Sequence, residues 1–317
     1  NQDTARMAGM TPPDCLAVSW FWFLGAAYLT QFPAYTRTVL NGSESVVTLL
    51  LAGFSIGIGV GSMLCGRLSG KKVELGLIPI GALGMAIFGF DLSLAHLPSF
   101  SAAPLTLSQF LLSDGGWRII LDLAGMGICG GLYTVPLYAF IQTRVPSAVR
   151  ARVVAANNII NAALMVMASL AGILCLSILN MTIPQFFMGL AVLNGLAGIV
   201  ILFRIPRFFI RFLAWIISCF MYRITKSGDA NIPETGAAVL VSNHVSFMDW
   251  LLISAACRRP VRFIMYEPIY RIPVLHWLFR WVKAIPIQSR RTNPGIYQDA
   301  FREISAALEN GELICIF

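Results

Sequence analysis

Long apolar stretches alternate with short polar segments over the first two thirds of the chain. Six stretches are each long enough to cross the about 30 Å of hydrocarbon in a bilayer. They lie at residues 15–38, 45–66, 74–97, 117–142, 153–179 and 183–203, and they predict six membrane-spanning helices. A further apolar segment, residues 205–222, carries Arg207 and Arg211 at helical spacing behind Arg204, which favours a helix lying in the membrane interface.

Beyond residue 223 the pattern changes to short apolar runs separated by polar turns. Strands are predicted at residues 237–241, 261–265 and 284–287 and from residue 312 onward, with helices from residue 247, at 274–282 and at 293–311. Such alternation is typical of an α/β sheet domain. The sequence therefore predicts a polytopic α-helical membrane domain at 1–204, an amphipathic interfacial linker helix at 205–224 and the N-terminal part of an α/β domain at 225–317.

Charge refines this picture. Basic residues cluster after the second, fourth and sixth predicted spans, whereas residues 97–116 and 180–184 contain no Lys or Arg. The positive-inside rule then places both chain ends, and the α/β domain, in the cytoplasm. The chain is 57% hydrophobic and 12% charged, far below the about 25% charged residues of soluble domains. In a membrane protein, we interpret the net charge of +8 as topology signals and anionic-lipid contacts, and we expect no nucleic-acid partner.

Other composition signals narrow the function classes. The seven cysteines are scattered singly, without a C-x-x-C motif or a Cys/His cluster, so we expect no disulfide framework and no metal site. The chain begins at Asn1, and its first residues lack the layout of a signal peptide. We therefore expect a piece of a longer protein.

The segment VSNHVSFMDW places His244 five residues before Asp249, directly after a predicted buried strand. A neutral imidazole can take a proton from an alcohol near pH 7, and a carboxylate on its other nitrogen fixes the tautomer. Asn243 and Ser246 would support the loop or cap the helix that follows. Spacing alone leaves the alternative of a histidine that merely lies near an acid. His276, on an apolar helix, is interpreted as a packed or interfacial histidine.

These residues resemble the N-H-x-S-x-x-D block of the glycerolipid acyltransferases, the lysophosphatidic acid acyltransferase-like superfamily. KAIPIQSRR, with Lys283, Arg290 and Arg291, resembles that family's second block, and Phe317 stands where its F-P-E-G block would begin. The resemblance implies His244 as general base, Asp249 as its orienting acid, and Arg290, Arg291 and Lys283 as binding residues for a substrate phosphate or an acyl carrier.

Eight basic residues lie between positions 258 and 291, interrupted by a single acid, Glu267. They predict either a solvated basic face against anionic lipid or a surface for phosphate headgroups and an acidic acyl carrier. The neighbouring WLFRW segment, 277–281, is typical of an interfacial strip.

Two features of the apolar region indicate transport. Gly61, Gly70 and Lys71 resemble the loop signature of the major facilitator superfamily, with Cys65 in place of its usual acid. The alternative is a tight turn between closely packed helices. Arg118 and Asp122 lie four apart, on one face of a predicted span. They are either functional intramembrane charges or a structural pair in which Arg118 snorkels to the interface.

Together the two regions resemble bacterial fusions of a facilitator-type lysophospholipid transporter with an acyl-[acyl-carrier-protein]–phospholipid O-acyltransferase. The resemblance implies a multi-pass protein of the bacterial inner membrane that moves lysophospholipids and re-acylates them. It also implies an acyl thioester, carried by acyl carrier protein or coenzyme A, as co-substrate without a bound cofactor. A second transporter half and an acyl-activating domain would belong to the same protein. The alternatives are a lipid transporter with a non-catalytic cytoplasmic domain, and an acyltransferase merely anchored by the spans.

Overall fold

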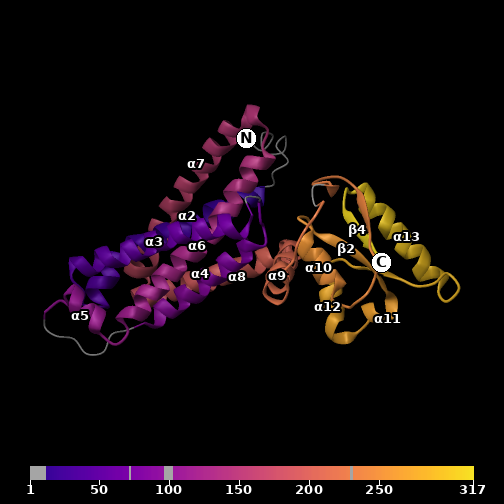
Figure 1. Ribbon diagram of the computed structural model, residues 1–317. Helices are drawn as coiled ribbons and strands as arrows, with labels where there is room; N and C mark the ends of the chain where they lie inside the picture. The colour runs from indigo at the N-terminus through magenta and orange to yellow at the C-terminus, as the bar shows by residue number, and fades with distance from the viewer. Residues whose placement is uncertain (1–11, 71–72, 96–102, 229–230) are drawn as a thin grey trace. The chain divides into compact units, whose positions relative to one another are not determined.

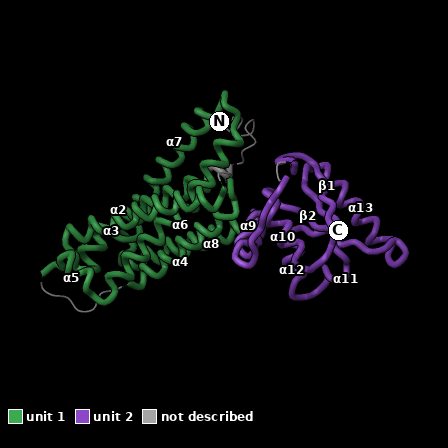
Figure 2. The backbone as a smooth tube through the Cα atoms, in the orientation of Figure 1, with its two compact units in different colours: residues 1–202 green, residues 203–317 purple. Residues whose placement is uncertain are grey.

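The computed structural model describes residues 12–70, 73–95, 103–228 and 231–317, so the predicted loop residue Lys71 lies outside the described residues. The chain divides into two compact units, residues 1–202 and 203–317 (Figure 2). The predicted boundary at 204 lies close to this division.

The first unit is helical (Figure 1). Its elements are α2 (Pro12–Thr38), α3 (Glu44–Leu68), α4 (Leu77–Leu94), α5 (Leu107–Leu112), α6 (Gly116–Arg144), α7 (Ser147–Gly172), the π-helical turn η1 (Ile173–Ile178) and α8 (Ile183–Arg204). Helix α6 packs along both α3 and α4, and α2 packs along α7. The short helix α5 and the π-helical turn were not predicted.

Within the described residues, five helical segments are long and apolar enough to cross a membrane. They are α3, α4, α6, α7 together with its π-helical end, and α8. Helix α2 has 27 residues and is not among the five. The first of the six predicted spans is thus a helix, and its crossing of the membrane stays a prediction.

Glycines allow α3 and α6 to approach at backbone distance. A Cβ atom on Gly61 would lie 2.1 Å from the carbonyl oxygen of Ile128, and one on Gly131 would lie 2.6 Å from the amide nitrogen of Ser62. Gly57 and Gly127, each four residues earlier, make equally close approaches. Both helices therefore present two small residues one turn apart, the arrangement that lets membrane helices pack tightly.

This packing changes the interpretation of the predicted facilitator loop. Gly61 is buried inside α3, which continues to Leu68, so no turn begins at Gly61. Gly70 follows the helix with a φ of +56°, a backbone conformation that favours glycine. The small-residue alternative accounts for Gly61, and a transport role for Gly61 and Gly70 stays a prediction.

Arg118 pairs with a different acid from the one expected. Its guanidinium donates to both carboxylate oxygens of Asp91, at 2.9 and 2.5 Å. Helix α4 packs along α6 and places Asp91 beside the start of α6, so the partner comes from the neighbouring helix rather than from Asp122. Asp122 is only 4% exposed.

The second unit contains a four-stranded parallel sheet with strand order β1-β4-β2-β3. The strands are β1 (Ala238–Val241), β2 (Val261–Tyr266), β3 (Ile285–Ile287) and β4 (Leu313–Ile316). The helices are α9 (Pro206–Met221), α10 (Asp249–Ala256), α11 (Glu267–Tyr270), α12 (Pro273–Trp281) and α13 (Pro294–Glu309). The predicted α/β alternation is confirmed, and α11 is an addition to it.

Both faces of the sheet are apolar, as expected of a parallel sheet covered by helices. On one face Leu313 and Cys315 of β4 pack in a cluster with Ile253 of α10. On the other face Ile314 packs with Ala300 and Ala307 of α13. The side chain of Asn293 caps α13 by accepting a hydrogen bond from the amide of Ile296 at 3.1 Å, as the sequence predicts.

Helix α9 is held to this sheet by its arginines. The guanidinium of Arg207 lies 2.7 Å from a carboxylate oxygen of Glu312, and the buried Arg211 donates to the carbonyl of Cys257 at 3.3 Å. Glu312 also binds the buried Arg262 at 3.0 Å, and Arg262 pairs with Glu303. These α9 arginines thus bind protein groups, while the exposed side of α9 is apolar, with Ile216, Ile217, Phe220 and Met221.

The glycine contact predicts a pair of opposite stability effects. Gly61→Ala should lower the thermal midpoint in detergent, at a cost of about 1–3 kcal/mol, because its Cβ would overlap the Ile128 carbonyl. Gly59→Ala is the matched control, since a Cβ at Gly59 meets nothing within 4 Å. Alanine is the better helix former, so the control should keep or raise the midpoint. Equal midpoints for the two variants would contradict the close approach.

The charge network predicts a pH-dependent effect. Burial raises the pKa of Glu312, but the pairs with Arg207 and Arg262 outweigh it and hold that pKa below its ordinary value. A lowered folded pKa stabilises the fold above the unfolded pKa of about 4.3 and loses this contribution as pH falls through the folded value. Glu312→Gln should destabilise the protein by about 1–3 kcal/mol at pH 7. The difference in thermal midpoint between Glu312→Gln and the wild type should become smaller as the pH is lowered toward 3. A difference that does not change with pH would contradict the proposed ion pairs of Glu312.

Candidate functional site

The predicted catalytic loop lies at the carboxyl edge of the parallel sheet. It connects β1 to α10, and β1 pairs in register with the neighbouring strand β4. The amide of Ser242 donates to the carbonyl of Ile316 at 3.0 Å, which extends this pairing into the loop. The carboxyl edge is where α/β sheets collect ligands, so the loop occupies a position suited to a binding site.

His244 and Asp249 meet within this loop. The imidazole Nδ1 lies 2.8 Å from Asp249 Oδ2. The same oxygen accepts the amide of Val245 at 2.7 Å and the amide of Ser246 at 2.9 Å. One carboxylate oxygen therefore receives three donors, and it fixes both the backbone of the loop and the imidazole.

These bonds favour the ionised form of Asp249. The amides of Ser246 and Val245, and then the His244 imidazole, outweigh burial and hold the pKa of Asp249 below its ordinary value. An ionised carboxylate only accepts hydrogen bonds, so Nδ1 of His244 must donate. In the neutral imidazole Nε2 then carries the lone pair, and the His244 side chain is 51% exposed. The arrangement provides an accessible base whose tautomer is set by its partner.

Polar loop residues make short-range bonds around this pair. Ser246 Oγ accepts the amide of Met248 at 3.2 Å, and the Ser246 carbonyl accepts the amide of Asp249 at 3.0 Å. The carbonyl of Asn243 accepts the hydroxyl of Ser242 at 3.0 Å. Ser246 thus begins the turn that leads into α10 and brings Asp249 back toward His244.

An aromatic ring packs against the imidazole, and the loop around His244 carries exposed apolar side chains. Its ring centroid lies 4.6 Å from that of Phe317, at an interplanar angle of 32°. Val241, Val245 and Phe247 are all more than three quarters exposed. The site therefore combines one base with an apolar surface.

The other predicted binding residues do not gather at His244. Lys283 precedes β3 and lies at the amino edge of the sheet, where its carbonyl accepts the Nε of Arg262 at 2.7 Å. Arg290 and Arg291 follow β3 at the carboxyl edge, but β3 is three strands away from β1. At about 4.8 Å per strand, this separation is about 14 Å. Only the two arginines share an edge with the imidazole.

Several members of the predicted basic face have structural partners. Arg259 donates to the carbonyls of Pro233, Gly236 and Gly311, and Arg271 pairs with Glu267. Arg262 is buried in the network described above, and Arg258 lies 4.0 Å from Glu234. Four of the eight residues in the predicted basic face therefore bind protein groups. The other four, Arg280, Lys283, Arg290 and Arg291, are exposed to solvent and therefore accessible to an anionic partner.

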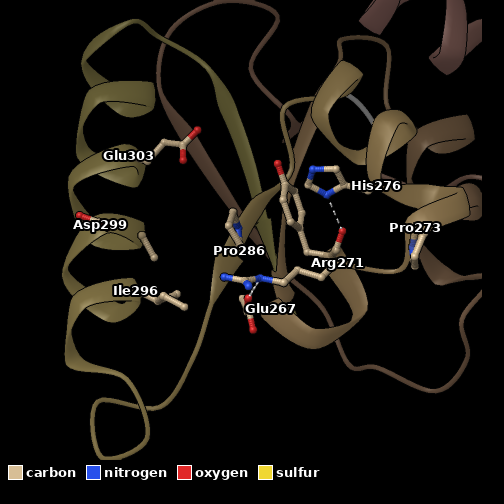
Figure 3. Close-up of a pocket in the computed structure, with 10 residues that line it drawn as sticks. Glu267, Arg271, Pro273, His276, Pro286, Ile296, Asp299 and Glu303 are labelled. Atoms are coloured by element: carbon tan, nitrogen blue, oxygen red, sulfur yellow. Dashed lines mark hydrogen bonds and ion pairs between the residues drawn. The ribbon is translucent and has the colours of Figure 1, made fainter.

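A separate open cavity of about 650 Å³ lies beside edge strand β3, between α13 and the α11–α12 segment (Figure 3). Its lining includes Pro286, Ile296, Glu303 and the Glu267–Arg271 ion pair. His276 also lines it, with Nδ1 3.0 Å from the carbonyl of Tyr270. No local sequence pattern predicted this cavity, because its walls come from segments that are separate in the chain. Across the described ranges, no group of three or more His, Cys, Asp or Glu residues could hold a metal ion.

Comparison with known proteins agrees with this geometry. The family model described as Acyltransferase matches residues 223–317, which contain the sheet, the His244–Asp249 pair and the cavity. No curated protein and no solved structure matches the chain. The C-terminal part of this chain thus matches the acyltransferase family, and in the described part of the chain five apolar helices of membrane length precede it.

Proposed function

We propose that residues 223–317 transfer a fatty acyl group from an acyl thioester to the free hydroxyl of a lysophospholipid, with His244 as general base. The observation that supports this most directly is the 2.8 Å bond between His244 Nδ1 and Asp249. It leaves a basic Nε2 on an exposed ring beside apolar side chains. An alcohol attached to a hydrocarbon chain is the substrate that such a surface suits.

The reaction balances without a bound cofactor. Nε2 of His244 takes the hydroxyl proton as the alcohol oxygen attacks the thioester carbonyl, and Asp249 stabilises the imidazolium that forms. The tetrahedral intermediate collapses with cleavage of the carbon–sulfur bond, and the thiolate takes the proton back from the imidazolium. The products are an ester and a free thiol. Because the acceptor alcohol attacks directly, no serine or cysteine of the protein needs to form an acyl intermediate.

The donor is a thioester of acyl carrier protein or coenzyme A. Both carry negative charge, and the exposed Arg280, Lys283, Arg290 and Arg291 offer complementary charge. The two arginines after β3 share the carboxyl edge with His244 at a distance of three strands, which suits them to an anionic group of a substrate away from the reacting atoms.

The position of the domain in the chain supports action at the cytoplasmic face of a bacterial inner membrane. Helix α9 begins at Pro206, two residues after the end of the candidate span α8. Two residues reach at most about 7 Å, so α9 starts close to the membrane surface. Its exposed apolar residues, including Phe220 at 93% exposure, suit contact with lipid. Trp277, on α12, is also exposed.

Lipid transport by the helical unit, coupled to acylation, is a second candidate function. It is supported by Asp122, which is 4% exposed within a candidate span, and by the Asp91–Arg118 pair nearby. Charged residues in membrane helices are costly and are usually retained for function. The facilitator-type resemblance of Gly61, Gly70 and Lys71 belongs to the same proposal. The alternatives are transport with a non-catalytic domain, and helices that only anchor the acyltransferase.

Replacing the base should abolish acyl transfer. His244→Ala should reduce the rate of transfer to labelled lysophospholipid by about 10²–10⁴-fold while the protein still folds, because the acceptor hydroxyl loses its base. The measurement uses purified protein in lipid nanodiscs with either acyl-carrier or coenzyme A thioesters. His276→Ala is the control, since His276 bonds to a backbone carbonyl outside the loop. Wild-type turnover in His244→Ala would rule out the proposed mechanism.

Replacing the buried Asp122 should impair transport and leave acylation intact. Asp122→Asn should reduce movement of labelled lysophospholipid across proteoliposome membranes to background, while acyl transfer to lipid supplied on the domain side continues. Asp114→Asn, an exposed position just before α6, is the control. Wild-type uptake by Asp122→Asn would contradict a transport role for Asp122 and favour helices that only anchor the acyltransferase.

A further inference from the structure

Three aromatic rings form a continuous column across the carboxyl edge of the sheet. Phe263 of β2 lies 5.9 Å from Phe317, centroid to centroid, with the two planes 8° from parallel. Phe317 follows β4 and lies 4.6 Å from the imidazole of His244. Because β4 lies between β1 and β2, the middle ring joins the catalytic loop to the central strands.

The column has a rigid end and an open end. Phe263 is 7% exposed and belongs to the apolar cluster that includes Leu313 and Cys315. Phe317 is 37% exposed, and the His244 side chain is 51% exposed. The buried Phe263 therefore restricts the position of Phe317, and Phe317 in turn restricts the position of the imidazole.

Asp249 alone does not fix the direction of Nε2. Its hydrogen bond holds one ring atom, Nδ1, at 2.8 Å, and the imidazole can still swing about that contact. A flat aromatic ring against the imidazole face removes this freedom, since offset or tilted ring pairs are favoured over other arrangements. The plane of the imidazole is then set by Phe317 and its tautomer by Asp249.

We propose that Phe317 is a positioning residue for the acyl transfer, which aims Nε2 of His244 at the acceptor hydroxyl by packing against the imidazole face. This inference rests on the proposed function and assigns the residue no contact with the reacting atoms. It predicts that an aromatic ring, rather than apolar volume alone, is required at position 317.

The test compares Phe317→Leu, Phe317→Tyr and Phe301→Leu in the full chain in lipid nanodiscs. Phe317→Leu should lower kcat by about 10- to 100-fold, the cost of a small misplacement of a catalytic group, with KM for both substrates nearly unchanged. Phe317→Tyr keeps the ring and should restore most of kcat. Phe301→Leu makes the same change at an exposed position on α13 and should leave kcat at the wild-type value.

A second readout does not depend on activity. The chain has three histidines, so selective ¹³C labelling of the imidazole Cε1 gives a spectrum with few signals. The His244 signal, assigned by its loss in His244→Ala, should carry an upfield ring-current shift that disappears in Phe317→Leu and persists in Phe317→Tyr. An unchanged His244 signal in Phe317→Leu, or wild-type kcat in that variant, would overturn the positioning role. Absence of acyl transfer by the wild type, with the ring-current shift present, would instead refute the proposed function.

Discussion

The acyltransferase domain depends on one carboxylate oxygen that satisfies three donors at once. Asp249 Oδ2 accepts the imidazole of His244 and the amides of Val245 and Ser246, all within 2.9 Å. The two amides hold the loop in a tight curl, and the same curl brings the imidazole to the acid. The loop conformation and the tautomer of the base are therefore consequences of a single ionised group. If Asp249 were protonated or removed, the amides of Val245 and Ser246 would lose or weaken their shared acceptor. The imidazole of His244 would no longer be held in one orientation.

The sheet supplies the frame for this loop. Because the strand order is β1-β4-β2-β3, the loop after β1 lies beside the end of β4, a strand reached only after three further crossovers in the chain. Phe317 reaches the imidazole for this reason. At the amino edge of the sheet, Glu312 forms ion pairs with Arg207 and Arg262, and the pair with Arg207 holds helix α9 against the sheet. The strand β4 thus connects the loop of His244 at one end with helix α9 at the other.

Local patterns predicted much of this fold. The strands, the cap of α13 at Asn293 and the meeting of His244 with Asp249 depend on residues close together in the sequence, and these agree with the structure. The predictions that failed concern partners distant in the chain. Arg118 pairs with Asp91 of α4, and the α9 arginines Arg207 and Arg211 bind protein groups. Helical spacing shows which residues share a face, but it does not show what covers that face. The groove beside β3 was missed for the same reason.

The central claim is that Asp249 fixes His244 as a base whose lone pair lies on Nε2. The most direct measurement is the pair of ¹⁵N chemical shifts of the neutral His244 imidazole in the substrate-free protein in lipid nanodiscs. We expect the neutral ring to be protonated at Nδ1 with an unprotonated Nε2, and to become a mixture of tautomers in Asp249→Asn. A wild-type ring protonated at Nε2 would contradict it, because that nitrogen could not accept the proton of the acceptor hydroxyl.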